Sequence, residues 1–434
     1  MKKYIFISAV ALFALAACSK VTIGDGIDAR REVSFQVANY TASTKANVAL
    51  EEFDSFNTYA IFHSSDTENP FQWFMEDEKV IAKMNGETIS KWVPEHPFYW
   101  PKTGNISFYS YTGTRKPTVW PTPKETGPNA VDIEKEGNVM FQFGAPVPLP
   151  DATSDEPEYD MSGQLDIRGI PVPVDPDDPS IGYYPADNIM VADPAYQLTV
   201  TSNSDGENVK FDQNDPGFTG VPTLFHHMLA KIRFQVVLDA SKSTDRTTWT
   251  VTIPEQTLLE VPRYGYLKVK YPRISSGRVG LTVDQIEWHP FGDLNGEKFV
   301  DRIKARSMEL TATGPNVTEQ DTNNLIWVPE EPVSEDSDVL KPICEREFVV
   351  IPRYCELTAF HFGFTMKSEY TDGQTTYTGV TEKVTVSKTM HDLGTDEWLP
   401  NHIYTYKIII KTNGEVLFQP HFVQWEEDTP TMDL

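Results

Sequence analysis

The chain contains none of the short motifs that mark the common kinds of active site. Gly-x-Ser-x-Gly, His-Glu-x-x-His, Cys-x-x-Cys and the glycine-rich Walker loop are all absent from its 434 residues. The usual acyl-transfer, zinc and phosphate chemistries therefore have no local signature here. We expect neither an enzyme nor a bound cofactor, and we nominate no catalytic or metal-binding residue.

Basic side chains are scarce relative to acidic ones. Lys and Arg number 37 against 63 Asp and Glu, which gives a formal net charge of −26. Without residues 1–17, which contain two lysines and no acids, the balance is 35 − 63 = −28. A surface of this sign repels phosphates, so we expect no nucleic-acid partner.

Only three cysteines are present, and the first is the most informative. Small residues precede Cys18 at the end of an apolar segment, 4–15, which follows Lys2 and Lys3. The segment is too short to span a bilayer, and the arrangement is typical of a bacterial lipoprotein signal peptide at 1–17. We expect Cys18 to carry a lipid anchor, since two or more acyl chains hold a protein stably at a membrane. An ordinary secretory peptide with an incidental cysteine is the alternative.

The other two cysteines, Cys344 and Cys355, flank one expected strand. A disulfide between them and two buried free thiols are both open at this point. No segment after the signal peptide is long and apolar enough to be a transmembrane helix. The lipid is therefore the only membrane anchor that the sequence shows.

Convincing amphipathic helices are also almost absent, and apolar residues recur instead at every second position. This period of two predicts strands with one buried face. It is seen at 33–37, 232–238, 249–253, 267–271, 360–366 and 380–386. The best short helical candidate, residues 226–231, runs directly into one of these strands.

Turn residues separate the apolar runs. Asn413-Gly414 lies between 404–411 and 415–419, which predicts a hairpin with a two-residue type I′ turn. Asp372-Gly373 and Asn295-Gly296 mark further turns. Many short strands without βαβ alternation indicate β-sandwiches rather than a parallel sheet.

The chain is too long for one core, so we predict an all-β protein with two β-sandwich domains in tandem. The signal peptide is followed by a tether or propeptide at 18–31. The N-terminal domain is expected at 32–200 and the C-terminal domain at 201–434. The boundary is placed where a polar stretch separates two apolar strands.

Three further features have ordinary explanations beside functional ones. His226-His227 could supply metal ligands, but neighbours on a strand point to opposite faces, which favours one packed and one exposed histidine. Asp175, Asp177 and Asp178 could bind calcium, yet they lack EF-hand spacing and fit a solvated acidic loop. Several tryptophans could stack on sugars or, more simply, fill strand-rich cores. They are Trp73, Trp92, Trp100, Trp120 and Trp288.

Residues 97–111 have the sequence Pro-Phe-Tyr-Trp-Pro-Lys-Thr-Gly-Asn-Ile-Ser-Phe-Tyr-Ser-Tyr. Further characteristic segments follow at 189–192, 221–234 and 404–427, and residues 31–46 begin the series with Arg-x-x-x-Phe and a later Thr-Lys-Ala. Each segment is loose alone, but their order after a lipoprotein signal is more specific. Together these segments cover the whole mature chain, and their order resembles that of the fimbrillin family of Bacteroidetes.

This resemblance implies a subunit of a type V pilus with Greek-key, transthyretin-like sandwich domains. It implies export as a lipoprotein to the cell outer membrane, where an Arg- or Lys-directed protease removes the lipidated N-terminal strand. A strand from another pilin subunit then fills the vacated groove by β-augmentation, which satisfies open backbone groups. The expected location is the cell surface and, after processing, the fimbrium.

Three basic residues are candidate processing sites. Arg30 and Arg31 precede the first strand, and Lys45 follows it. Only a cut after Lys45 would remove that strand. The lysine departs from the arginine that many family members carry at this kind of site. The alternative for the two arginines is that they are solvated charges in a tether.

The candidate donor strand contains Phe422, Val423 and Trp425, which are apolar enough to fill a groove but could equally complete the protein's own sandwich. The expected hairpin favours the second interpretation for 415–419 and leaves 421–434 as the freer segment. Stalk, tip and lipid-retaining anchor roles stay open. The large insertions at 114–179 favour a tip or accessory subunit that contacts a ligand on a host or bacterial surface.

A function of a different class fits the same anchor, β-domains and acidity. It is a glycan-binding surface lipoprotein of an uptake system, with exposed aromatic residues as stacking platforms.

Overall fold

The computed structural model describes most of the strand-forming residues. The described ranges are 27–38, 55–64, 71–85, 88–101, 103–113, 115–120, 139–144, 147–148, 159–160, 165–167, 172–173, 183–184, 189–198, 220–271, 280–291, 293–294, 297–298, 300–305, 307–315, 348–379 and 381–424. Within them the chain is all-β, as predicted, with one short 3₁₀ turn, η4 (Val283–Gln285). Over the same ranges, no helix has the length and apolar character needed to cross a bilayer.

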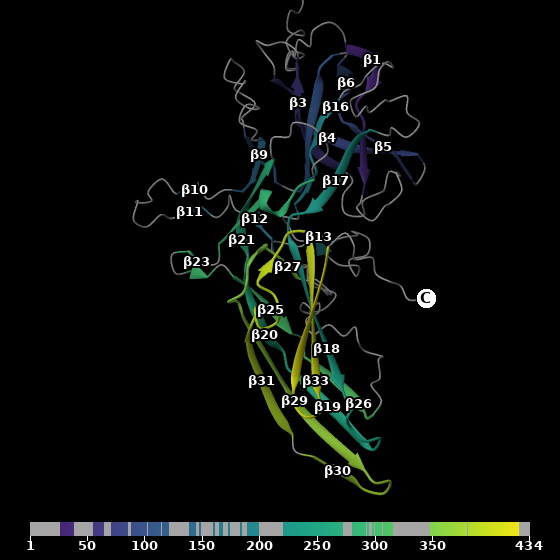
Figure 1. Cartoon of the computed structure of the whole chain (residues 1–434), viewed down its shortest axis with the longest axis vertical. Helices are drawn as coiled ribbons and strands as arrows, with labels where there is room; N and C mark the ends of the chain where they lie inside the picture. Colours follow the sequence, from purple (N-terminus) through teal and green to yellow (C-terminus); the bar gives the residue numbers. More distant parts are fainter. Residues whose placement is uncertain are drawn as a thin grey trace, which may run out of the picture.

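Eight strands at one end of the molecule form the largest sheet (Figure 1). In spatial order they are β15 (Met190–Ala192), β17 (Val221–His227), β2 (Phe35–Ala38), β5 (Thr88–Pro94), β4 (Phe71–Asn85), β3 (Ser55–His63), β7 (Asn105–Thr112) and β16 (Ala195–Leu198). Because β7 also pairs with β15, the first seven strands of this order close into a ring. The sequence predicted a β-sandwich for this part of the chain, whereas the structure has a closed ring of seven strands.

Alternation explains how the ring is filled. A strand sends successive side chains to opposite faces, so every second residue of the ring strands meets a common core. Phe56 packs against Trp92 and Phe225, with ring centroids 5.6 and 5.2 Å apart, and Trp100 packs against Phe108. This aromatic cluster, together with the aliphatic residues around it, fills the ring.

A five-stranded sheet covers one outer face of the ring. It consists of β12 (Leu165–Asp166), β21 (Tyr264–Tyr271), β9 (Val139–Phe143), β8 (Thr118–Trp120) and β22 (Ile286–Phe291). Tyr59 and Tyr109 of the ring pack against Phe141 at centroid distances of 5.4 and 6.5 Å. A second core therefore lies between ring and sheet.

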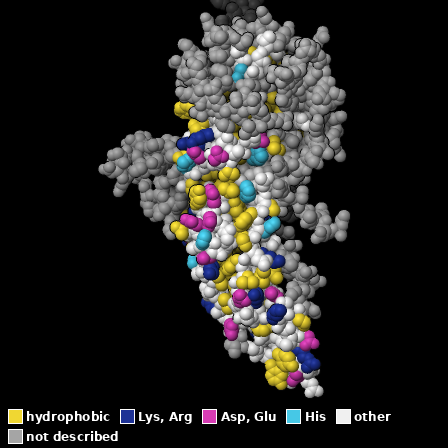
Figure 2. All heavy atoms as spheres, in the orientation of Figure 1, with side chains coloured by type: hydrophobic (Ala, Val, Ile, Leu, Met, Phe, Trp, Pro, Cys, Tyr) yellow, Lys and Arg dark blue, Asp and Glu magenta, His cyan; other side chains and the backbone are white. Residues whose placement is uncertain are grey.

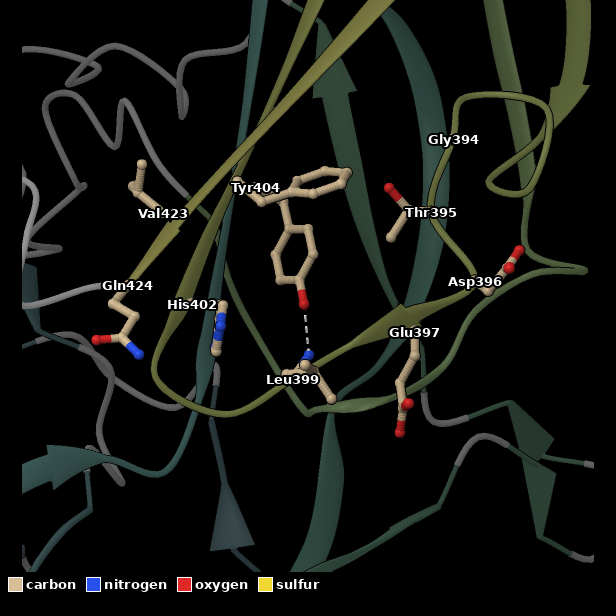
Figure 3. Close-up of a pocket in the computed structure, with 10 residues that line it drawn as sticks. Gly394, Thr395, Asp396, Glu397, Leu399, His402, Tyr404, Val423 and Gln424 are labelled. Carbon is tan, nitrogen blue, oxygen red and sulfur yellow. Dashed lines mark hydrogen bonds between the residues drawn. The ribbon is translucent and has the colours of Figure 1, made fainter. Parts of the chain in front are cut away.

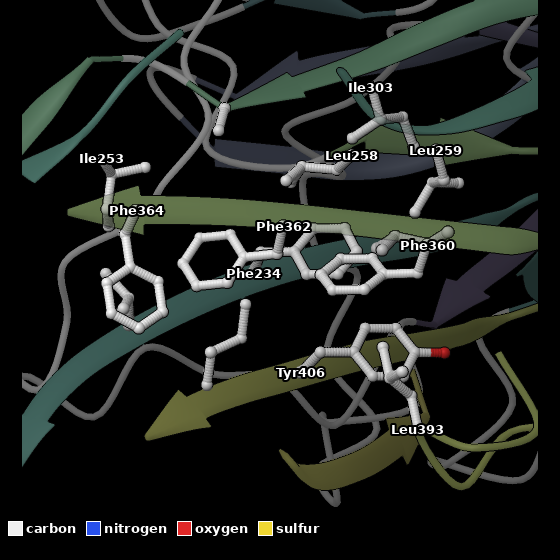
Figure 4. Close-up of a cluster of buried hydrophobic side chains, with 14 of the residues drawn as sticks. Phe234, Ile253, Leu258, Leu259, Ile303, Phe360, Phe362, Phe364, Leu393 and Tyr406 are labelled. Atoms are coloured by element: carbon white, nitrogen blue, oxygen red, sulfur yellow. The ribbon is translucent and has the colours of Figure 1, made fainter. Parts of the chain in front are cut away.

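Two further sheets form the other end of the molecule (Figure 1). One is β27 (Phe348–Val350), β18 (Ala230–Asp239), β33 (His402–Lys411) and β34 (Val416–Gln424); the other is β26 (Met308–Thr313), β19 (Thr247–Ile253), β29 (Ala359–Thr371) and β30 (Thr376–Thr378), with β31 (Glu382–Thr389) also on β29. Phe234 of the first sheet stacks on Phe360 of the second at 5.4 Å and on Tyr406 of its own sheet at 5.3 Å (Figure 4). The two sheets therefore share one core.

Six two-stranded pairs complete the described structure. They are β1 (Ile27–Glu32) with β6 (Tyr99–Pro101), β10 (Val147–Pro148) with β11 (Tyr159–Asp160), β13 (Val172–Pro173) with β14 (Tyr183–Tyr184), β20 (Gln256–Pro262) with β25 (Val300–Ala305), β23 (Asp293–Leu294) with β24 (Glu297–Lys298), and β28 (Arg353–Tyr354) with β32 (Glu397–Trp398).

The sheets do not follow the expected boundary between residues 200 and 201. Strand β17 belongs to the ring, and β21 and β22 belong to the sheet that covers it, although all three follow that boundary in the chain. The polar stretch before β17 therefore joins two strands of the eight-stranded sheet, β16 and β17. The chain passes from the ring to the other end between β17 and β18.

Two local predictions need correction. Residues 226–231 form no helix, because β17 ends at His227 and β18 begins at Ala230. The β33–β34 hairpin is confirmed, but its turn is not type I′. A type I′ turn needs a positive φ at both central residues, but only Gly414 has one, at 83°, and Asn413 does not. The amide of Gly414 donates to the carbonyl of Lys411. This is a wider turn that ends in a glycine in the left-handed conformation.

Candidate functional site

Strand β2, which follows β1 near the start of the described residues, lies in a segment whose alternate side chains are buried. Val33, Phe35 and Val37 are 0% exposed, whereas Ser34 and Gln36 between them are half-buried. The ring of Phe35 meets Phe56 and Phe108 edge to face, at centroid distances of 5.4 and 5.6 Å. Burial of such side chains contributes roughly 2 kcal/mol each. The first strand is therefore part of the ring's core.

The backbone pairing of β2 is unusual within its sheet. Phe35–Ala38 run parallel to residues 221–224 of β17, while the other pairings of the ring are antiparallel. The amide of Val221 donates to the carbonyl of Ser34 at 2.7 Å. On its other side β2 pairs with β5 at Phe35 and Trp92. Strand β2 thus closes the ring between β17 and β5.

Gly220 allows β17 to approach β2 this closely. Its φ is +135°, and a Cβ atom at this position would lie 2.6 Å from the carbonyl oxygen of Ser34. Only glycine adopts such a backbone without strain and leaves this space free. Nothing in the sequence before Val221 marked this glycine as a partner of the first strand.

The candidate processing residues lie in different situations. Arg30 and Arg31 are in β1, which pairs with β6 between Ile27 and Pro101 and between Glu32 and Tyr99. Part of the range predicted as a tether, 18–31, therefore belongs to a strand. Lys45, and the lipidation candidate Cys18, lie outside the described residues.

Strand β34 contains two of the three candidate donor residues. It pairs antiparallel with β33 from Val416 to Gln424, so the hairpin extends further than the sequence indicates. Phe422 is opposite Tyr404, and Val423 is opposite Ile403. Trp425 lies outside the described residues. In this structure Phe422 and Val423 therefore complete the protein's own sheet.

Strand β34 is an edge strand, and its second half is loosely covered. It pairs with β33 alone in the four-stranded sheet, and residues 419–422 are exposed. Pro420 fits an edge because it has no amide hydrogen to donate. A cavity of about 500 Å³ lies beside this half, and Phe422, Val423 and Gln424 of the strand contribute to its lining (Figure 3). The strand thus flanks a cavity here, although Val423 also packs against a small cluster of buried residues.

His63 at the end of β3 is a buried histidine of the ring. It is 7% exposed, and its Nε2 lies 3.0 Å from the Ser107 hydroxyl. Burial lowers the pKa of His63 from 6.5 to about 4. The folded ring therefore keeps this imidazole neutral over a range in which the unfolded chain takes up a proton.

This difference predicts a pH dependence of stability. As the pH falls from 6.5 towards 4, the unfolded state gains a proton that the folded state does not, so the free energy of unfolding falls. We expect His63 to account for a loss of about 3 kcal/mol between pH 7 and pH 4. Denaturant unfolding of wild type and His63→Gln at both pH values measures it. An equal pH dependence in the two proteins contradicts the assignment.

The other residues singled out from the sequence are mostly structural. His227 is buried, and His226 is half-buried with its Nε2 2.9 Å from Asp193 Oδ1. The residues that the structure describes contain no group of three or more metal-ligating side chains. The acidic loop at 175–178 lies outside the described residues.

Cys355 is a free, buried cysteine whose thiol lies 3.8 Å from the carbonyl oxygen of Thr395, and burial raises its pKa to about 12. It therefore packs as an inert thiol. Cys344 lies outside the described residues.

The tryptophans divide by position. Trp92 and Trp100 are buried in the ring core, and Trp73 and Trp288 pack partly buried against the core beside it. Trp120 in β8 is 57% exposed. Four of the five therefore serve packing, as expected from strand-rich cores.

Comparison with known proteins finds solved structures only. No protein-family model and no curated protein matches the chain. A fimbrial protein of Bacteroides vulgatus is 15% identical with a TM-score of 0.40, over 91% of this chain and 99% of that one. A candidate cell adhesion protein of Bacteroides uniformis is 13% identical with a TM-score of 0.32, over 92% of this chain and 99% of that one. A fimbrial assembly protein of Parabacteroides distasonis is 8% identical with a TM-score of 0.31, over 89% of this chain and 98% of that one.

The similar solved structures are thus fimbrial and cell adhesion proteins of the Bacteroidales. At these TM-scores the likeness assigns no function to this chain.

Proposed function

We propose that this chain is a pilus subunit that assembles by exchange of its first strand for a strand of a neighbouring subunit. One observation carries the proposal. The seven-stranded ring is closed by a short strand, β2, that follows β1 near the start of the described residues and runs parallel to β17, and Val33, Phe35 and Val37 of this segment lie in the ring's core.

Loss of β2 would leave an open groove that another strand can fill. The backbone groups of β17 and β5 that face β2 would be unpaired, and the aromatic cluster around Phe56 and Phe108 would meet water. Unpaired strand edges beside an apolar groove recruit extended segments. An incoming strand with apolar residues at alternate positions restores both the pairing and the core.

The segment order that resembles fimbrillins supplies the remaining parts of the proposal. The chain is exported as a lipoprotein on Cys18 to the outer membrane, and a protease cut after Lys45 releases β2 together with the anchor. The C-terminal residues from Phe422 onward supply the donor to the next pilin subunit. Head-to-tail repetition of such a contact gives a filament because the interface does not close.

We further propose that the two ends of the molecule correspond to Greek-key sandwich-derived domains, with the ring as the acceptor. The long insertion at 114–179 exceeds what a stalk module needs, which favours a tip or accessory subunit that contacts a surface ligand.

Replacement of the cleaved lysine tests the proposal. We expect Lys45→Gln to retain β2 and to abolish incorporation into filaments in the native bacterium, because only this cut separates β2 from the ring. N-terminal sequencing of surface-shed protein should begin at Ala46. Immunogold electron microscopy then locates the label along filaments, at their tips or at the membrane.

The matched control is the double variant Arg30→Gln, Arg31→Gln, which alters basic residues on the other side of β2. It should assemble as the wild type does. Filaments that contain chains beginning at Glu32 with β2 still present would contradict the proposal.

A further inference from the structure

The cavity beside β34 has walls from several separate segments. Thr395, Asp396 and Glu397 come from the turn before β33 and from β32, and Leu399, His402 and Tyr404 from the approach to β33 and its first residues. Strand β34 closes the remaining side. Figure 3 shows Tyr404 between Val423 and Gln424 on one side and the 394–397 segment on the other. The volume of about 500 Å³ is typical of small-molecule sites.

A hydrogen-bond network holds these walls in place. Trp398 Nε1 donates to the Tyr406 hydroxyl at 3.1 Å, and that hydroxyl donates to Thr395 Oγ1 at 2.9 Å. The Leu399 amide donates to the Tyr404 hydroxyl at 2.7 Å. The site is therefore preformed, which lowers the cost of ligand binding.

An aromatic surface faces this site. The rings of Tyr404 and Phe422 lie 5.0 Å apart at 54°, and Phe422 is 42% exposed. An exposed aromatic ring on an edge strand offers an apolar face against which the C–H groups of a ligand can pack.

Polar groups stand beside the rings without partners of their own. Neither the Glu397 carboxylate nor the Gln424 side-chain amide has a hydrogen-bond partner among the residues that the structure describes. Asp396 is different, because its carboxylate lies 2.6 Å from His391 Nδ1. The site thus offers acceptors at Glu397 and both a donor and an acceptor at Gln424.

This combination selects among ligand classes. An anion is repelled by Asp396 and Glu397. A cation finds only one carboxylate that is not already paired, and an apolar ligand would strip water from Glu397 and Gln424 without replacing its hydrogen bonds. A neutral saccharide has hydroxyl groups that donate and accept and an apolar face that packs on Phe422.

We propose that this cavity binds a neutral mono- or disaccharide. The site exists while β34 is paired within its own sheet, and a subunit that has donated the residues from Phe422 onward would lack it. For a ligand of this size, a dissociation constant of about 1 mM is expected.

Saturation-transfer NMR with the full chain tests the site, using glucose, galactose, N-acetylglucosamine and lactose, with cadaverine and citrate as charged probes. At least one saccharide should bind. Phe422→Ala and, independently, Glu397→Ala should weaken that binding tenfold or more. Two variants are used so that a folding defect in one, detected by its thermal unfolding, leaves the other decisive.

Tyr377→Ala is the matched control, because Tyr377 is an exposed aromatic residue on another edge. It is 54% exposed and stands in the β29–β30 hairpin at the far end of the molecule, where Figure 2 shows hydrophobic side chains at the surface. This variant should bind as the wild type does. No saccharide binding at ten times the expected dissociation constant, stronger binding of cadaverine or citrate, or a loss confined to Tyr377→Ala would overturn the proposal.

Discussion

Replacing Phe35 by alanine is expected to lower the free energy of unfolding of the ring by about 3–5 kcal/mol. Phe35 is 0% exposed, and its ring fits edge to face between Phe56 and Phe108. Truncation removes the buried area and leaves a cavity that these neighbours cannot fill by small movements. Denaturant unfolding, followed by the fluorescence of the buried Trp92 and Trp100, measures the loss.

The same change should weaken the hold of a cut chain on its own first strand. After cleavage between β2 and β3, residues 32–45 have no covalent link to the ring, and a loss of 3–5 kcal/mol lowers their affinity for it by about 10²- to 5 × 10³-fold. A fluorescent peptide of these residues, with and without Phe35→Ala, measures the affinity of the emptied ring.

Ser34→Ala provides the control directly before the same strand. Ser34 is half-buried and alternates with the buried Val33 and Phe35, so its truncation should change the affinity by less than about 0.5 kcal/mol. Equal effects of the two substitutions would mean that backbone pairing alone holds β2. The ring core would then not select the incoming strand, and exchange driven by the apolar core would be contradicted.

The strands themselves could be predicted from the sequence because burial leaves a local trace. In β18, Ile232, Phe234, Val236 and Leu238 are buried while the residues between them are half-buried, as alternation requires. The same holds for β29 around Phe362. Such patterns need no knowledge of the partner strand, since one face of any half-buried strand meets a core.

The partners of a strand leave no such trace. The pattern of Val33, Phe35 and Val37 predicts a strand with one buried face, but not that its neighbour begins at Val221 or that the two run parallel. For the same reason the boundary expected at residue 200 separates strands that the structure pairs. Which strands pair depends on contacts between residues that are distant in the sequence. The free energy of such a contact includes the entropic cost of closing the loop between the strands, which local composition does not show.

Local chemistry also has limits at turns. Asn413-Gly414 predicted the hairpin correctly because glycine is needed at a left-handed position, and Gly414 takes it. Asn413 does not adopt the left-handed conformation, and its side chain instead stabilises the turn because Oδ1 accepts a hydrogen bond from the amide of Glu415 at 3.0 Å. The candidate saccharide site has still less local signal, because its walls come from turns and strands whose approach only the fold determines.

A disulfide between β33 and the end of β34 is expected to abolish the donation of β34 to a neighbouring subunit. His402 and Gln424 pair directly across the two strands, which brings their Cα atoms within the range that a disulfide bridges. In the oxidised double variant His402→Cys, Gln424→Cys the strand is fixed to its own sheet. Assembly in vitro, followed as ladders on SDS gels, should stop and should return on reduction.

The locked chain retains an intact acceptor ring at the other end of the molecule, so its effect in mixtures is specific. Added to wild-type subunits after processing, it should accept a donor strand but offer none, and the ladders should shorten as its share rises. The matched control is Thr371→Cys, Thr376→Cys across the β29–β30 hairpin, where the two residues pair in the same way. Its oxidised form should assemble normally. If the locked chain forms ladders as long as the control's, β34 remains in its own sheet during assembly and the donor lies beyond Gln424.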